Sequence, residues 1–345
     1  MDISQLGEFG LIDKLTEDLK PANKTTVYGV GDDAAVLEYG NRCTLVTTDM
    51  LMEGVHFDLT YMPLKHLGYK SAIVNISDIY AMNGKPEQMT LSVALSKRFS
   101  VEDMQEFYEG VKLACNRHGV DLVGGDTTSS LTGLAISITC IGSADKEDIV
   151  YRNGAHNTDL ICVTGNLGAA YMGLQLLERE KSVYYSTEHS GNEPFSPDFA
   201  GKEYLLERQL KPEARGDVLE DLRKAGIRPT SMMDISDGLS SELLHICKQS
   251  HCGCTVYEER IPVDYQTAVM AEEFNMNVFT CALNGGEDYE LLFTVPLTDF
   301  EKVSKIKDVK VIGHITDSEN VKILVTKDGQ QFDLKAQGWQ SNLDR

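Results

Sequence analysis

The sequence lacks a long hydrophobic segment. No run of about 18 apolar residues occurs among its 345 residues, so no segment has the length of a membrane-spanning helix. The first residues, MDISQLGEFG, contain neither the basic segment nor the apolar stretch of a signal peptide. We therefore expect a cytoplasmic protein with no membrane partner.

Basic residues are scarce. The chain has 32 Lys and Arg against 53 Asp and Glu, which gives a formal net charge of -21. Such a field argues against a large surface for nucleic acid or for an anionic membrane. A nucleotide substrate would have to arrive together with its metal ion.

The familiar nucleotide-binding motifs are also missing. The sequence has no G-x-x-x-x-G-K-[ST] loop, and neither the H-R-D nor the D-F-G signature of protein kinases. Residues 29–34 (GVGDDA) lack the third glycine of a dinucleotide-binding fingerprint. If the protein uses ATP, it must hold ATP in another way.

The eight cysteines are scattered through a chain that is far too large for a disulfide scaffold. We expect most of them to be reduced core residues. Cys252 and Cys254 form the one close pair, and His251 beside them makes a soft-metal site conceivable. No second Cys or His pair stands at zinc spacing, which favours the core interpretation.

Length and pattern predict two domains. A chain of this size exceeds one ordinary core, and helical and strand patterns alternate throughout, which indicates an α/β or α+β fold. We place the boundary near residue 150, giving domains 1–150 and 151–345. The predicted strands are 44–48, 91–95, 134–141, 161–165, 232–235 and 291–293, and the predicted helices are 64–82, 101–118 (capped by Ser100), 169–181, 216–225 and 239–249. Residues 182–201 are polar and aperiodic, which predicts a surface loop or insertion.

Six aspartates stand where loops and strand ends could gather them in one cleft: Asp33, Asp49, Asp78, Asp126, Asp234 and Asp237. Two carboxylates about 6 Å apart repel by roughly 3 kcal/mol at an effective dielectric of about 20, so such a cluster needs cations. Hard oxygen ligands suit Mg²⁺, which proteins usually share with substrate phosphates. The pattern therefore indicates several magnesium ions and phosphate transfer.

Two of these aspartates have informative neighbours. Strand alternation places Thr47 and Asp49 on one face, although Asp49 could simply end its strand, and His56 could be either a packed side chain or a substrate contact. Asp78 lies in the middle of an apolar helix, where an ionised carboxylate needs a partner. That position weakens the alternative of a capping or surface aspartate.

Three glycine-containing segments complete the pattern. Residues 122–128 (LVGGDTT) are an apolar strand end that runs into glycines and an aspartate, which suits either an ion or phosphate site or a simple turn. In residues 233–239 (MDISDGL), Asp237 could bind metal-bound phosphate at a helix N-terminus or could merely cap that helix. Residues 285–290 (GGEDYE) are either a binding edge or a solvated turn.

These motifs, taken together and in order, resemble those of the thiamine-monophosphate kinases, within the wider superfamily of aminoimidazole-ribonucleotide synthetase. The resemblance spans roughly residues 7–315 and rests on GEFGLI, GVGDDAAVL, TTDMLMEGVHF, NISDIYAMNGKPEQ, GGDTT, MDISDGL and NGGEDYELLF. It implies a homodimer in which the N-terminal α/β domains form a dimer-spanning sheet or barrel. The active site would lie in the cleft between that domain and a C-terminal α+β domain.

The resemblance also implies a reaction, in which the γ-phosphate of ATP passes to thiamine monophosphate and gives thiamine diphosphate and ADP. It implies roles for three sets of residues. The magnesium ligands would be Asp33, Thr47, Thr48, Asp49, Asp78, Asp126, Asp234 and Asp237; the ATP contacts would be Tyr108, Gly125, Arg152 and Ser236; the thiamine contacts would be His56, Glu287 and Trp339. The chain departs from the family at its tail, where Ser341 and Asn342 stand in place of the usual histidine and phenylalanine, and residues 182–201 are longer than the family needs.

The absence of an obvious general base fits this chemistry. A phosphate monoester has a second pKa near 6 and is already largely a dianion at pH 7, so it needs no base. The alternatives are a selenophosphate or aminoimidazole-ribonucleotide synthetase, or a metal- or nucleotide-binding module without catalysis. A selenophosphate synthetase would need a reactive residue in an N-terminal glycine-rich loop, and the first 42 residues contain no cysteine.

Overall fold

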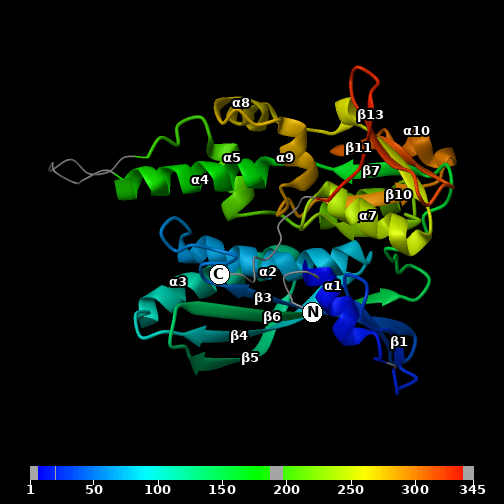
Figure 1. The fold of residues 1–345 in the computed structure, drawn as a ribbon. Helices are drawn as coiled ribbons and strands as arrows, with labels where there is room; N and C mark the ends of the chain where they lie inside the picture. The colour runs from blue at the N-terminus through cyan, green and yellow to red at the C-terminus, as the bar shows by residue number, and fades with distance from the viewer. Residues whose placement is uncertain (1–6, 20, 187–196, 337–345) are drawn as a thin grey trace.

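The computed structural model describes residues 7–19, 21–186 and 197–336. It shows two domains, each a mixed sheet with helices (Figure 1). The elements of the first domain are α1 (Gly7–Thr16), β1 (Thr26–Tyr28), β2 (Ala35–Glu38), β3 (Arg42–Met52), α2 (Leu64–Ala81), β4 (Lys85–Leu95), α3 (Val101–His118), β5 (Asp121–Ser129) and β6 (Leu134–Asp145). Those of the second are β7 (Leu160–Thr164), α4 (Ala169–Ser186), α5 (Glu203–Leu210), α6 (Gly216–Lys224), β8 (Ser231–Asp234), α7 (Leu239–Ser250), β9 (Gly253–Tyr257), α8 (Tyr265–Glu273), α9 (Val278–Asn284), β10 (Leu291–Val295), α10 (Phe300–Val303), β11 (Val309–Thr316), β12 (Lys322–Val325) and β13 (Gln331–Asp333).

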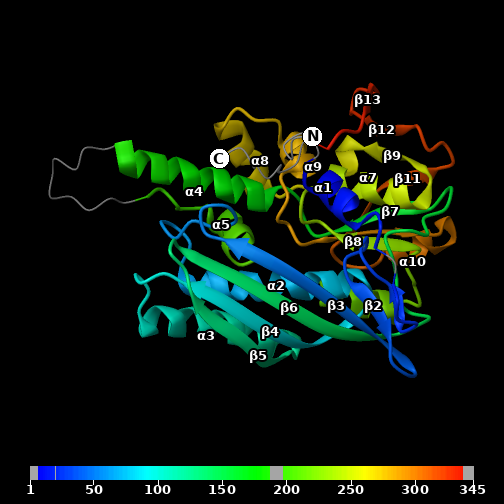
Figure 2. The same ribbon diagram turned by 60° about the horizontal axis from the view of Figure 1, so that its bottom comes forward.

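The first sheet has the strand order β1-β2-β3-β6-β4-β5, and every pair is antiparallel except β4 and β5. Along β3, Leu45 and Leu51 are buried while Thr48 and Met50 on the other face are exposed. Helices α2 and α3 cover the buried face, and Figure 2 shows the opposite face of the sheet without a helix over it. The sheet is open within this chain, with β1 and β5 at its edges.

Helices α2 and α3 pack with their backbones almost in contact. A Cβ atom added to Gly68 of α2 would lie 1.9 Å from the carbonyl oxygen of Phe107 on α3, so no side chain fits there. Ser100 caps α3 in a reciprocal capping box with Asp103, as the sequence predicts. The two helices therefore form a rigid layer under the sheet.

The second sheet has the order β13-β12-β9-β11-β7-β10-β8 and is covered on both faces. Along β7, Ile161 and Val163 belong to one core with α7, whereas Leu160 and Cys162 belong to the core with α6. A strand that is buried on both sides reads as a continuous apolar run, which is how residues 160–164 appear in the sequence. The first sheet ends at β6 and the second begins at β7, and the predicted boundary near residue 150 lies between them.

Helix α2 lies between the two domains (Figure 1). One side packs on β3 and β6 of the first sheet, and the other contacts β8 and α5 of the second domain. The hydroxyl of Tyr69 donates to Glu213 at 2.8 Å across this junction. Side chains of this one helix therefore contact both domains.

The structure removes one alternative and corrects one prediction. Residues 124 and 125 are not a turn after a strand, because β5 continues through them to Ser129 in parallel register with β4. Gly125 is required there because a Cβ atom would lie 1.8 Å from the carbonyl oxygen of Leu91. The predicted loop 182–201 is partly helix, since α4 continues to Ser186, and residues 187–196 lie outside the described residues.

Among the described helices, none is both long enough and apolar enough to cross a membrane.

Candidate active site

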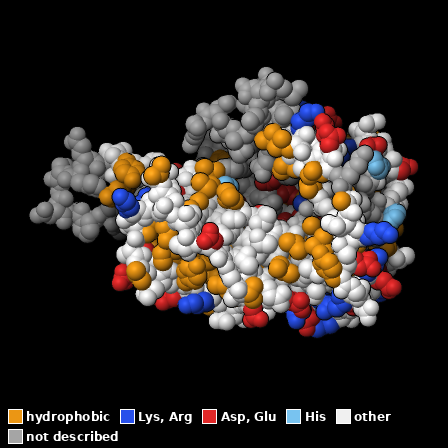
Figure 3. All heavy atoms as spheres, turned by 90° about the horizontal axis from the view of Figure 1, so that it is seen from below, with side chains coloured by type: hydrophobic (Ala, Val, Ile, Leu, Met, Phe, Trp, Pro, Cys, Tyr) orange, Lys and Arg blue, Asp and Glu red, His pale blue; other side chains and the backbone are white. Residues whose placement is uncertain are grey.

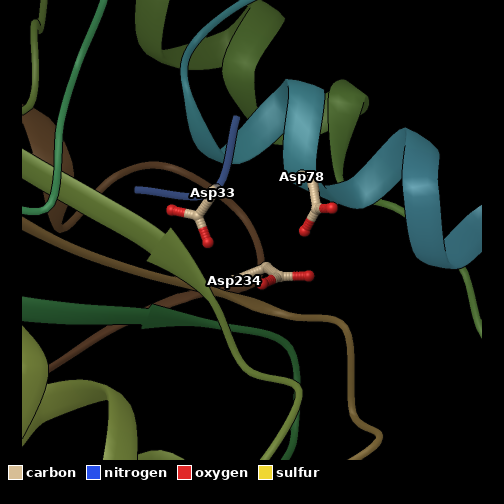
Figure 4. Close-up of side chains that lie close together, drawn as sticks. All are labelled: Asp33, Asp78 and Asp234. Carbon is tan, nitrogen blue, oxygen red and sulfur yellow. The ribbon is translucent and has the colours of Figure 1, made fainter. Parts of the chain in front are cut away.

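Three aspartates from separate parts of the chain meet at the junction of the domains (Figure 4). Asp33 lies in the loop between β1 and β2, Asp78 in the last turn of α2, and Asp234 at the end of β8. One carboxylate oxygen from each lies within 4.8 Å of the others. Asp33 and Asp234 are buried and Asp78 is partly buried. In Figure 3, acidic side chains line a hollow in the surface of the molecule.

Each carboxylate of this cluster has a neighbour that orients it. The Thr47 hydroxyl donates to Asp78 Oδ2 at 2.5 Å, and the Ser77 hydroxyl donates to Asp234 Oδ2 at 2.5 Å. Arg152 donates to Asp33 Oδ1 at 2.8 Å through its Nη2. The predicted roles of Thr47 and Arg152 therefore fall on residues that touch the cluster.

The cluster carries more negative charge than the protein around it neutralises. Burial, reinforced by Asp49, Asp234 and Asp33, raises the pKa of Asp78 well above its usual value. Burial and the charge of Asp33 raise the pKa of Asp234 to about 8, although Ser77 and Arg152 oppose the rise. Buried carboxylates with pKa values raised in this way are stabilised as anions by a bound cation, and their oxygen ligands suit Mg²⁺.

The adjoining loop 235–238 is held by a residue that the sequence analysis did not identify. Glu242, which is 1% exposed, accepts hydrogen bonds from the backbone N–H groups of Ser236 at 3.2 Å and Asp237 at 2.7 Å. The N-cap of α7 is Gly238, so Asp237 lies one residue before the capping position.

The loop 285–290 is not a solvated turn, because its three acids have different surroundings. Asp288 and Glu290 are buried, and Asp288 accepts from the backbone N–H of Gly168 at 2.8 Å. Glu287 is partly exposed, and its backbone N–H donates to the Ser236 carbonyl at 2.7 Å. This bond ties the predicted substrate residue to the loop that follows Asp234.

Several predicted ligands lie apart from the cluster. Thr48 is on the exposed face of β3 and donates to the Ile138 carbonyl at 3.0 Å. Gly125 and Asp126 lie on β5, which is separated from β3 by β6 and β4, so the spacing of sheet strands puts them about 14 Å away from β3. Asp126 is exposed and accepts from the backbone N–H of Thr127. The structure does not bring these residues to the three aspartates.

The remaining predicted contacts that the structure describes lie on separate elements. Tyr108 lies on α3 beside Phe107, whose carbonyl approaches Gly68, and Gly68 is about 15 Å before Asp78 along α2. His56 follows β3, and its Nδ1 accepts from the backbone N–H of Met52 at 3.0 Å. Asp49 is on β3, on the face that carries Thr47. Trp339 lies outside the described residues.

A cavity of about 1120 Å³ opens at the start of α2, between the first domain and α4. Aromatic side chains line it, and two polar contacts join the domains at its wall. Lys181 Nζ lies 2.8 Å from Asp58 Oδ2, and the Tyr61 hydroxyl donates to Glu178 at 2.7 Å. The aromatic lining residues are Tyr61, Phe99, Tyr184, Tyr185 and Phe199.

The cysteines are core residues, as expected, and all eight are buried free thiols. Cys252 and Cys254 both lie within hydrogen-bond contact of Cys247. The imidazole of His251 is exposed and lies 3.7 Å from Glu319, so it does not join these sulfur atoms.

Comparison with known families matches nearly the whole chain. Residues 31–144 match the family model of the AIR synthase related protein N-terminal domain, and residues 159–326 match that of its C-terminal domain. The first region contains β2 to β6 except the last residue of β6, and the second contains β7 to β12.

Individual relatives are more specific. The chain is 35% identical over 339 residues to thiamine-monophosphate kinase of Aquifex aeolicus, covering 98% of this chain and 99% of the relative. It is 34% identical over 325 residues to thiamine-monophosphate kinase of Buchnera aphidicola subsp. Schizaphis graminum, covering 91% and 93%. A solved structure, AaThiL complexed with AMPPCP and TMP, superposes with a TM-score of 0.82 at 34% identity and covers 99% of this chain and 98% of that chain.

Proposed function

Because the chain belongs to the thiamine-monophosphate kinase family, we propose that it transfers the γ-phosphate of ATP to thiamine monophosphate and forms thiamine diphosphate and ADP. The observation that carries this proposal is the buried cluster of Asp33, Asp78 and Asp234 at the domain junction. A similar chain binds AMPPCP and TMP, according to the description of its structure. ATP chemistry also supports a cytoplasmic location.

We propose that the three clustered aspartates hold Mg²⁺, with Thr47, Asp49 and Asp237 beside them. The oxygen ligands of the three aspartates and the raised pKa values of Asp78 and Asp234 fit a divalent cation. When bound, Mg²⁺ would supply neutralisation of the phosphate charges and alignment for in-line transfer. The chain's own contribution is to fix the carboxylates through Thr47, Ser77 and Arg152.

Asp126 and Thr48 remain proposed ligands without support from their positions in this chain. The change Asp126→Asn is nearly isosteric on an exposed strand, so we expect it to preserve the fold. If Asp126 completes the metal shell in the working enzyme, the variant should lose most of its turnover. Near wild-type turnover at saturating magnesium would remove Asp126 from the ligands.

ATP would extend along the junction under this proposal. Arg152 and Ser236 stand at the aspartates, where phosphates would lie, and Tyr108 stands toward the other end of α2 with the adenine. Gly125 is less well supported as an ATP contact, because its lack of a side chain is already explained by the contact with Leu91.

The thiamine part of the acceptor would contact His56, Glu287 and Trp339. Thiamine carries a thiazolium cation, so the partly exposed carboxylate of Glu287 offers an opposite charge. The cavity at the start of α2 adds aromatic and acidic walls near this region. An organic cation with aromatic rings is the kind of group that such walls favour.

The reaction needs no general base from the chain. The acceptor phosphate is already largely a dianion at pH 7, whereas an alcohol acceptor would require removal of a proton. We therefore expect the enzyme to phosphorylate thiamine monophosphate but not free thiamine.

We also propose a homodimer formed through the open face of the first sheet, which would give a dimer-spanning sheet or barrel. Its support is the exposed face of β3 and its neighbours, which no described helix covers (Figure 2). Met50 and Met52 are large apolar residues exposed on that face. Sedimentation equilibrium should give twice the chain mass of 38.2 kDa.

A coupled assay tests the proposed function. It compares thiamine monophosphate, thiamine and no acceptor at saturating ATP and magnesium, and identifies the product by chromatography. Formation of thiamine diphosphate from the monophosphate alone supports the proposal. ATP hydrolysis that phosphorylates neither thiamine monophosphate nor thiamine would favour another synthetase of the superfamily. ATP binding without hydrolysis would favour a non-catalytic module.

A further inference from the structure

Lys70 is a buried cation that joins the two domains. It lies on α2 and is 1% exposed, yet its Nζ donates to the Gln209 carbonyl at 3.0 Å and to Glu287 Oε2 at 3.0 Å. Taking an ammonium out of water costs several kcal/mol, and its partners must offset this cost. An apolar residue would fill the same space at a lower cost if packing were the only requirement.

Glu287 is fixed from several directions. Its Oε2 accepts from Lys70 and also from Gln209 Nε2 at 3.0 Å. Its backbone has a φ of 57°, a left-handed conformation that is strained in a residue other than glycine. Its N–H is bonded to Ser236. The carboxylate is thus held rigidly, and its side chain is still 31% exposed.

The two donors leave one side of the carboxylate available. Both bind Oε2, and no hydrogen bond within the described residues engages Oε1. A carboxylate held at one oxygen and open at the other is suited to accept N–H groups or to face a positive charge. It would repel a phosphate.

We propose that Lys70 is a positioning residue which, together with Gln209, holds Glu287 so that Oε1 faces the cationic, N–H-bearing organic part of the phosphate acceptor. This inference rests on the proposed function. Lys70 precedes Asp78 by about 12 Å along α2. If the phosphate of the acceptor lies at the aspartates, this interval along α2 would leave its organic part near Lys70 and Glu287.

The result would differ if Lys70 only stabilised the contact between the domains. Its loss would then lower stability and weaken the binding of both substrates alike. Loss of a positioning residue should instead weaken binding of the acceptor while ATP binding is retained, since Glu287 has no favourable contact to offer a phosphate.

The experiment compares Lys70→Met and Lys70→Arg with the wild type. For Lys70→Met we expect the KM for thiamine monophosphate to rise about tenfold or more, because a buried charge pair loses one partner, while the KM for ATP stays within about twofold. Lys70→Arg keeps the cation and should recover much of the acceptor KM. Lys65→Met, on the same helix and in an exposed pair with Glu109, is the matched control and should resemble the wild type.

Gln209→Met provides a second test if Lys70→Met does not fold. It removes the other donor to Glu287 but leaves the Gln209 carbonyl that Lys70 binds, and it should also raise the acceptor KM selectively. An unchanged acceptor KM, or equal changes in both KM values, would overturn the inference. A wild type that does not phosphorylate thiamine monophosphate would instead refute the proposed function.

Discussion

Two sites with buried carboxylates differ in how their negative charge is balanced: Glu290 in the second domain, and the aspartate cluster at the domain junction. Glu290 is 2% exposed, and arginines contact both of its oxygens: Arg215 donates at 2.6 Å and Arg208 lies 2.9 Å away. Asp33, Asp78 and Asp234 are brought together, and Arg152 on Asp33 is the one basic side chain of the described residues that hydrogen-bonds to any of them.

The difference indicates that the aspartate cluster, rather than Glu290, is the site for a positively charged ligand. The chain supplies the cations for Glu290 itself, so that network can serve the fold alone. The described residues place one arginine on the aspartate cluster, and burial together with the charges of neighbouring aspartates raises the pKa values of Asp78 and Asp234. A cluster of this kind is stable as an anion only when something else brings positive charge.

Breaking the balanced network should have the largest effect. Arg215→Met leaves Glu290 with a single arginine and should lower the free energy of unfolding by about 3 to 5 kcal/mol, as removal of one partner from a buried pair does. Urea titration followed by circular dichroism measures it. Lys224→Met, in exposed pairs with Glu220 and Asp221, should leave stability nearly unchanged. Equal stability of the two variants would contradict the comparison.

Removing one charge from the unbalanced cluster should chiefly affect catalysis. Asp78→Asn should lower kcat by about 100-fold or more, because a metal ligand is lost, which corresponds to about 2.7 kcal/mol. The fold should persist, which circular dichroism would verify. Near wild-type kcat at saturating magnesium would show that Asp78 does not hold a metal.

The same change at Asp234 should stabilise the metal-free protein, although substitutions of buried residues usually destabilise a protein. Asp234→Asn relieves repulsion, so without metal the variant should be more stable than the wild type by about 1 kcal/mol, or a few degrees in Tm. Its Tm should respond less to magnesium with ATP. Thermal scans with and without ligand decide the matter. Earlier melting of the metal-free variant, or an unchanged response to ligand, would make Asp234 a structural residue.

The smallest expected effect is a pH dependence of stability without metal. The folded-state pKa of Asp234 is raised to about 8, above its usual value near 4, so the folded protein binds this proton more readily than the unfolded chain does. Stability from this group is present at low pH and is lost as the pH rises through about 8. In chelator, Tm should therefore fall between pH 6 and pH 8 more steeply in the wild type than in Asp234→Asn. Parallel curves would contradict the assignment.

The sequence predicts the elements and part of the cluster for physical reasons. The helix 101–118 has a capping signal and a regular apolar period, and the structure reproduces its bounds. Asp33, Asp78 and Asp234 meet at the domain junction from a loop, the last turn of a helix and the end of a strand, and the sequence had named all three as candidate ligands.

Other features left no local signal. Glycines at residues 124 and 125 look like a turn, but they lie in a strand because β4 passes close to them. Lys70 and Glu242 act through partners in other segments, and no periodicity in their own helices distinguishes them. Their roles depend on tertiary contacts, which a single sequence does not display.

The placement of α2 limits how this sequence can change in length. One residue inserted or deleted between Lys70 and Asp78 would turn one side chain relative to the other by about 100° and shift it by about 1.5 Å. Either Lys70 would leave Glu287, or Asp78 would leave Thr47. Substitutions within the helix can be accommodated by repacking, but a change of register cannot. Length variation among relatives should therefore fall in the loops on either side of α2, and the interval within the helix should stay constant.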